Sequence, residues 1–165
     1  MERWLRWCVA LLIGAASAVC HAENLSGPRI GVTVLSSETL AFARSHDLYL
    51  SDTITQFGWQ FERNFFTTNQ GPQGITALVP LLGGADQGVL LPSVSWVTGL
   101  RMPSGYEYVI GPNVSISGIG MAFAMGKTYR VGEVNFPVNF SVATSNKGWR
   151  ASILFGFNSV ENARN

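Results

Sequence analysis

Apolar side chains recur at every second position along most of this chain, and this period constrains its fold more than any other feature. In segment 134–142, Val, Phe, Val, Phe and Val alternate with Asn, Pro, Asn and Ser. Segments 119–126 and 149–157 alternate in the same way, with mostly large apolar residues on one face. A side-chain period of two is the geometry of a β-strand, so the chain is predicted to be all-β.

Turn-forming residues separate the alternating segments and set the number of strands. Clusters that contain Gly, Pro, Asn or Asp stand between them, at 69–72, 83–86, 102–105, 132–133 and 145–148. Seven strands are predicted between residues 53 and 158, and 29–35 supplies an eighth. The helix candidate is 37–44, with Ser36 or Ser37 as its N-cap. About eight sequential strands predict an antiparallel up-and-down β-barrel.

The composition of the two strand faces indicates which of them meets water. Charged residues make up only 13% of the chain, whereas hydrophobic residues make up 47%. This balance excludes a disordered chain and a nucleic-acid-binding protein. One face carries Trp, Phe, Val and Ile, and the other carries mainly Gly, Ala, Ser and Asn. A soluble barrel needs a charged exterior, so we expect the aromatic face to meet lipid and the small polar face to line a narrow lumen.

The first 22 residues are predicted to be a cleaved secretory signal peptide. A basic start at 1–6 precedes an apolar run at 7–16 and then small residues, with cleavage after Ala22, or alternatively after Ala18. An N-terminal membrane anchor is the other interpretation, but the apolar run is shorter than the roughly 20 residues that span a bilayer. A lipoprotein modified at Cys20 is disfavoured by the bulky Val19 before it.

Removal of residues 1–22 from the 165-residue chain leaves 143 residues, which we expect to form a single β-barrel domain over 23–165. This domain has a long first loop at 36–52 and a C-terminal tail at 159–165. Both cysteines, Cys8 and Cys20, are lost with the signal peptide. A disulfide, a thiol nucleophile and a cysteine-ligated metal site are therefore not expected, and we assign no cofactor and no metal ligand.

Over residues 29–158, the chain resembles the small outer-membrane β-barrel proteins of Gram-negative bacteria. The resemblance rests on the signal peptide, the eight alternating segments, the lack of cysteine in the mature chain and the aromatic-rich last strand at 149–157. This last strand resembles the terminal strand that the barrel-assembly machinery recognises, although the chain continues through 158–165. The resemblance implies an outer-membrane location, with the periplasm as the alternative. It also implies periplasmic termini, and it places on the outer side 36–52, 83–89, the turn near 117 and 144–148.

The predicted lumen carries four charged side chains, which are Glu62, Arg101, Glu107 and Arg150. An eight-stranded barrel is just wide enough to be filled by side chains, so a diffusion pore is not expected. The four charges balance in sign, which favours an internal network of ion pairs; a small polar binding cavity is the alternative. Aromatic residues are expected on the lipid face or at strand ends, at Trp59, Trp96, Tyr106, Tyr108, Tyr129 and Trp149.

One cluster in the first loop contains the residue types of a nucleophilic enzyme, namely Ser45, His46 and Asp47, with Ser51 and Asp52 nearby. A palmitoyltransferase family of small outer-membrane barrels has its histidine in the first outer loop, and His46 is similar to it in position only. Consecutive residues seldom have the geometry of a triad, so no catalytic residue is assigned.

Three functions remain open at this point. The favoured one is a membrane barrel with a structural or surface-interaction role, whose partners are the lipopolysaccharide-containing bilayer and, during biogenesis, the barrel-assembly machinery. The loop partner is unknown, and no nucleic acid is expected. The alternatives are an enzyme acting on lipid acyl chains through His46, and a soluble periplasmic barrel that encloses a lipid-like ligand with its aromatic face.

Overall fold

The computed structural model describes residues 25–68, 71–132 and 134–159, so the predicted signal peptide at 1–22 lies outside the described residues. The described part is almost entirely β-structure, and its elements follow the alternating segments of the sequence. They are β1 (Gly27–Leu35), α2 (Ser37–Arg44), β2 (Thr53–Thr67), β3 (Gln73–Gly83), η1 (Ala85–Gln87), β4 (Leu91–Arg101), β5 (Tyr106–Ser115), β6 (Gly118–Val131), β7 (Val134–Ser145), β8 (Gly148–Gly156) and β9 (Asn158–Ser159).

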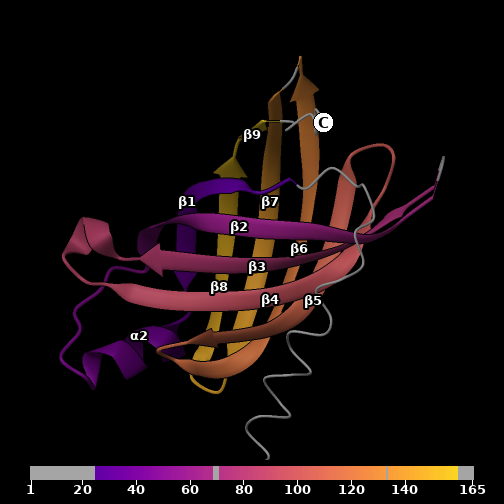
Figure 1. Cartoon of the computed structure of the whole chain (residues 1–165). Coiled ribbons are helices and arrows are strands. Elements are labelled where there is room, and N and C mark those ends of the chain that lie inside the picture. The colour runs from indigo at the N-terminus through magenta and orange to yellow at the C-terminus, as the bar shows by residue number, and fades with distance from the viewer. Residues whose placement is uncertain (1–24, 69–70, 133, 160–165) are drawn as a thin grey trace, which may run out of the picture.

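The eight long strands form a closed antiparallel barrel. Each strand pairs with its neighbours in sequence, and β1 also pairs with β8, so the sheet has no open edge between the first and last long strands. Val32 of β1 lies opposite Thr55 of β2 on one side and Ile153 of β8 on the other. In Figure 1, β2, β3 and β4 cross in front of β7 and β8, as tilted strands on opposite walls of a barrel do. The predicted fold, an up-and-down barrel of eight strands, is confirmed.

Two strands extend further than the alternation of apolar residues indicated. β2 continues to Thr67, and β6 continues to Val131, which lies opposite Val134 of β7. Lys127 faces outward among apolar residues and interrupts the pattern. The strand persists there because cross-strand backbone hydrogen bonds do not depend on which side chain points outward.

The chain does not leave the sheet where the predicted C-terminal tail begins. After Phe157, residues 158 and 159 form β9 and pair with Asn135 and Val134 of β7. The first residue of the predicted tail at 159–165 is thus paired in the sheet, while 160–165 lie outside the described residues. Asn158 is 2% exposed and hydrogen-bonds to the chain near the start of β1, which anchors this segment.

Four connections gather at one end of the barrel, and they include the segments that the resemblance placed together on the outer side, a location that stays a prediction. They are the helix-containing loop after β1, the loop with η1 after β3, and the tight turns after β5 and β7. The helix candidate is confirmed, because α2 spans Ser37–Arg44 with Ser36 as its N-cap. α2 lies at the end opposite β9 (Figure 1).

The barrel is polar inside and apolar outside. In β1, Arg29, Gly31 and Thr33 are buried, whereas Ile30 and Val32 between them are exposed. Inward-facing glycines let neighbouring strands approach each other closely. A Cβ on Gly31 would lie 1.9 Å from the carbonyl oxygen of Ile153 on the next strand, so no other residue fits at that position without a backbone shift.

Candidate functional site

The outer surface is an aromatic and aliphatic belt. Every aromatic side chain that the structure describes is exposed, except Phe42 in α2. The six aromatics predicted for the outer surface are among them, at Trp59, Trp96, Tyr106, Tyr108, Tyr129 and Trp149. A soluble barrel that encloses a ligand with its aromatic face does not fit this arrangement, because that face points away from the lumen.

Lys127 is the positively charged member of the belt on β6. Its ammonium group lies 4.7 Å from the ring centroid of Tyr106 and 5.3 Å from that of Tyr129. Cation–π contacts of this kind hold a charged head beside aromatic rings while the aliphatic stem covers apolar surface. The two tyrosines and the lysine form a polar edge to the belt near one end of β5 and β6.

A network of charged side chains crosses the lumen near the end that carries β9. Arg101 of β4 forms a bidentate ion pair with Glu62 of β2, with Nη–Oε distances of 2.6 and 2.7 Å. The same guanidinium donates to Glu107 of β5 at 2.7 and 3.1 Å. Glu62 is 2% exposed and Glu107 is 3% exposed. The network satisfies these charges where water has little access, which a buried ion pair requires if it is not to destabilise the fold.

Neutral amides extend this network to the barrel wall. Asn139 of β7 donates from Nδ2 to Glu107, and Gln60 donates to Glu62 at 2.9 Å. Arg29 of β1 donates to Gln60 at 3.1 Å and to Asn158 of β9 at 3.1 Å. Residues from six strands thus meet in one cluster, which blocks this end of the lumen.

The four lumen charges predicted from the sequence all face inward, but they do not form one balanced network. Arg150 is separate from the others, and Arg29 joins them instead. Among the described residues, the lumen therefore holds three guanidinium groups and two carboxylates, so the predicted balance of charge is wrong. The parity of β1 could have revealed Arg29, because it shares the inward face with Gly31 and Thr33 and is opposite in phase to Ile30.

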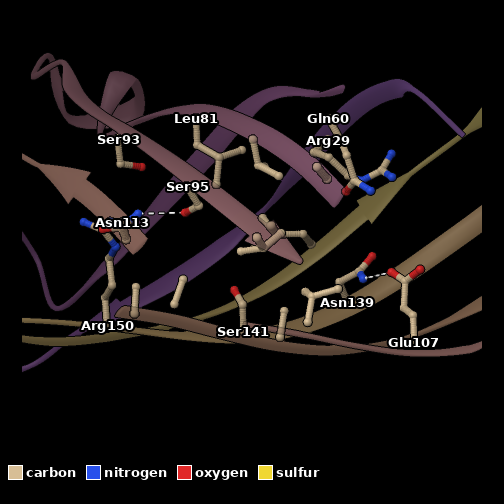
Figure 2. Close-up of a pocket in the computed structure, with 18 of the residues that line it drawn as sticks. Arg29, Gln60, Leu81, Ser93, Ser95, Glu107, Asn113, Asn139, Ser141 and Arg150 are labelled. Atoms are coloured by element: carbon tan, nitrogen blue, oxygen red, sulfur yellow. Dashed lines mark hydrogen bonds between the residues drawn. The ribbon is translucent and has the colours of Figure 1, made fainter. Parts of the chain in front are cut away.

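Between the network and α2, the lumen contains a cavity of about 70 Å³ (Figure 2). Small apolar side chains form much of its wall, including Ala77, Val97 and Ala122. Polar side chains line both of its ends: those of the charged network at one end, and those around Arg150 toward α2 at the other. At the α2 end, Arg150 Nη2 donates to Asn113 Oδ1 at 2.6 Å. Asn113 Nδ2 in turn donates to Ser95 Oγ at 2.7 Å. The predicted network of ion pairs is therefore present, and a small cavity with polar ends lies beside it, whereas binding in that cavity stays a prediction.

The α2 end of the barrel is closed by an apolar cluster. Leu35, Ala43, Leu50, Ile54 and Leu91 are buried together there, with Leu40, Leu48 and Val89 packed against them. These residues come from β1, α2, both wide loops and the starts of β2 and β4. The lumen is therefore covered at one end by the helix and at the other by the charged network.

α2 is fixed to the turn between β7 and β8 through its N-cap. Ser36 Oγ accepts from the amide of Thr39 at 3.4 Å, which satisfies a free amide of the first helical turn. The same oxygen accepts from the amide of Trp149 at 3.1 Å, and Ser36 donates its own amide to the Trp149 carbonyl at 3.0 Å. Thr39 Oγ1 also donates to the carbonyl of Lys147 at 3.2 Å.

The loop between β3 and β4 is hydrogen-bonded to the end of the first loop and to the start of β2. Asp86 Oδ1 accepts from the hydroxyl of Thr55 at 2.7 Å and from its amide at 3.2 Å. The hydrogen bond from the Thr55 hydroxyl is the main cause that lowers the pKa of Asp86. Gln87 donates to the Thr53 carbonyl and accepts from the Ser51 amide, both at 2.8 Å.

The Ser45–His46–Asp47 cluster does not have the geometry of a catalytic triad. His46 is exposed, and its Nδ1 lies 3.0 Å from the carbonyl of Phe42 and 3.1 Å from Ser45 Oγ. The Ser45 hydroxyl donates to the same Phe42 carbonyl at 2.7 Å. No hydrogen bond between the imidazole and a described carboxylate orients the ring, and Asp52 instead accepts from Thr53. These contacts end α2, as polar side chains near a helix C-terminus commonly do.

Comparison of the chain with protein-family models, curated proteins and solved structures finds no match in any of the three. Among the described residues, no group of three or more His, Cys, Asp or Glu side chains is arranged to hold a metal ion. None of the helices in the part of the chain that the structure covers has the length and apolar character to cross a membrane.

Proposed function

We propose that this protein is an outer-membrane barrel with a closed lumen, and that it acts in structure or surface interaction rather than as a diffusion pore. The observation that carries the proposal is the reversed polarity of the barrel. Large apolar side chains such as Ile30, Phe123 and Ile153 are 47–64% exposed, whereas Arg29, Glu62 and Glu107 are 2–3% exposed. A bilayer is the solvent in which such a surface is stable, because water would leave a continuous apolar patch around the molecule.

The strand lengths support the same environment. The eight long strands have from 9 to 15 residues, and a tilted strand needs about 9–11 residues to cross the hydrocarbon layer. The exterior aromatics and Lys127 then provide the polar-tipped side chains that are typical of the membrane–water interface. The partners that follow are the lipids of the outer membrane, including lipopolysaccharide, and the barrel-assembly machinery during insertion.

Two obstructions in series argue against a pore. The apolar cluster beneath α2 covers one end of the lumen, and the pairs of Arg101 with Glu62 and Glu107 cross it near the other. The space between them is about 70 Å³, enough for a few small molecules, as expected for an eight-stranded barrel whose interior is largely filled by side chains.

The end that carries α2 is the surface proposed for interaction. Tyr49 is 76% exposed and Leu90 is 64% exposed, and they lie in the two loops that the Gln87–Ser51 hydrogen bond connects. Apolar side chains held outward on loops with this support are suited to contact a partner, because the loops lose little conformational freedom on binding. We therefore expect the surface contacts of this protein to involve 36–52 and 84–90.

Envelope fractionation combined with gel mobility tests the proposal. The full chain is expressed in a Gram-negative host, and outer-membrane, inner-membrane and soluble fractions are run with and without boiling. A barrel in the outer membrane gives a band in that fraction whose mobility changes only on boiling. A band in the soluble fraction with no mobility shift contradicts the proposal. Reconstitution of the same sample in liposomes should give no swelling in sugar solutions, and rapid swelling contradicts the closed lumen.

A further inference from the structure

Arg150 is a charged side chain inside the barrel without a carboxylate partner. Its one hydrogen bond to a described residue is to the neutral Asn113, and the ion pairs of the lumen all belong to Arg101. A guanidinium group stays protonated at any physiological pH. Arg150 is partly buried, and withdrawing a charge from bulk water without a counter-charge is costly, so the surroundings of Arg150 should supply negative charge or water.

The charges of the lumen leave one positive charge in excess. Glu62 and Glu107 are both engaged by Arg101, and Arg29 donates only to neutral groups, which are Gln60, the Pro28 carbonyl and Asn158. Three guanidinium groups against two carboxylates give a surplus of one. A single monovalent anion would restore neutrality.

The cavity beside Arg150 offers hydrogen-bond donors that the protein leaves unused. Ser93 of β4 and Ser141 of β7 both line it (Figure 2), and no described residue hydrogen-bonds either hydroxyl. Ser93 is only 5% exposed, and Ser141 is partly buried. Buried hydroxyl groups are normally hydrogen-bonded. Two hydroxyl groups and a guanidinium group thus line one cavity, and all three can donate hydrogen bonds to an anion.

The space suits a small ion. At about 70 Å³, it holds a chloride-sized anion together with a few waters, since one water needs roughly 10–15 Å³ by the same measure. Alanine and valine side chains line the middle of the cavity and limit the size of an occupant. The Glu107 carboxylate also lines the cavity, at the end away from Arg150 (Figure 2), where it is already engaged by Arg101. An anion would therefore bind at the Arg150 end.

We propose that the lumen contains a site for a monovalent anion of chloride size, held by the Arg150 guanidinium and the hydroxyls of Ser93 and Ser141. The site neutralises the surplus charge of the interior and couples the β4, β7 and β8 walls beneath α2. It exists in the barrel whether or not the protein resides in the outer membrane, so this inference stands apart from the proposed function.

Thermal unfolding in different salts tests the site. The protein purified in detergent is heated in sodium chloride or sodium gluconate at equal ionic strength, and folding is followed by the heat-dependent gel mobility or by tryptophan fluorescence. We expect chloride, but not the bulky gluconate, to raise the unfolding midpoint by a few degrees with saturation. The difference between salts should be lost in Arg150→Gln and retained in Arg44→Gln, since Arg44 is exposed on α2. Equal midpoints in both salts for the unaltered protein, or an unchanged chloride effect in Arg150→Gln, would overturn the proposal.

A second measurement covers the case in which Arg150→Gln does not fold. Crystals of the unaltered protein soaked in bromide should show an anomalous peak within hydrogen-bond distance of the Arg150 guanidinium, and Ser93→Ala with Ser141→Ala should weaken it. Water alone in the cavity, with no anomalous peak beside Arg150, overturns the proposal.

Discussion

At the scale of single residues, the most consequential group is the guanidinium of Arg101. Among the residues that the structure describes, it is the side chain that binds both buried carboxylates of the lumen, Glu62 and Glu107. The charges come from β2, β4 and β5, so the network connects strands that are not all neighbours in the sheet. Hydrogen bonds between ionised groups are about twice as strong as neutral ones, but each ion loses its hydration on burial.

Removal of Arg101 should therefore lower the free energy of unfolding by more than the loss of its hydrogen bonds alone would. Arg101→Met leaves two carboxylates buried close together without a cation between them, and we expect the free energy of unfolding to fall by about 3–5 kcal/mol. Urea titration of the refolded protein in detergent, followed by tryptophan fluorescence, measures it. Arg44→Met on the exposed face of α2 is the matched control and should change stability by less than about 0.5 kcal/mol. Equal effects of the two substitutions would mean that the network does not stabilise the barrel.

At the scale of elements, α2 covers one end of the lumen, and its attachment to the barrel depends on the turn between β7 and β8. Gly148 at the start of β8 has a φ of 117°, and a Cβ there would lie 2.4 Å from Ser36 Oγ and 2.5 Å from Thr39 Oγ1. These are the two side chains that fix the N-terminus of the helix to the β7–β8 turn. The absence of a side chain at residue 148 is thus what lets the helix approach the barrel rim.

Gly148→Ala should release α2 while the barrel remains folded. The expected cost is about 1–3 kcal/mol, since backbone strain adds to the steric conflict. Trypsin cleavage after Arg44 should become faster, while the heat-dependent mobility shift persists. Gly88→Ala is the matched control, because Gly88 also has a positive φ, 73°, but nothing lies within 4 Å of its added Cβ. If both variants are cleaved at the same rate, backbone strain alone accounts for the effect and the contact with α2 is unimportant.

At the scale of the whole molecule, the belt of outward side chains determines which solvent the barrel tolerates. Ile153 lies at the middle of the wall, opposite Val32 of β1 and Phe140 of β7. Ile119 lies one residue from the start of β6, at the rim. Both isoleucines face outward, with exposed fractions of 47% and 70%, so they differ mainly in depth.

A membrane environment predicts that the same substitution at these two positions has different effects. Ile153→Arg should lower the free energy of unfolding in lipid vesicles by about 2–4 kcal/mol, and Ile119→Arg by about 0–1 kcal/mol, because arginine at the rim can reach water. Denaturant titration of protein folded into phosphatidylcholine vesicles measures both. Similar small effects at the two positions would contradict a membrane-spanning belt.

Much of this architecture is local information that the chain carries by itself. The period of two determined the strands, and the chemistry of the two faces determined which one is outside, because side-chain direction alternates in any strand. The same parity identified Glu62, Arg101, Glu107 and Arg150 as inward, and the possible caps Ser36 and Ser37 indicated where the helix begins. Arg29 was within reach of this argument, since its phase in β1 is inward.

The tertiary structure decided which inward groups meet. Arg101 binds Glu62 at a separation of 39 residues, and Arg29 binds Asn158 at a separation of 129. Such contacts depend on the register of every strand around the closed barrel, which alternation does not specify, because a shift by two residues preserves the pattern. For that reason the sequence indicated four balanced charges, whereas closure of the barrel placed Arg29 in the network and left Arg150 beside a cavity without a counter-charge.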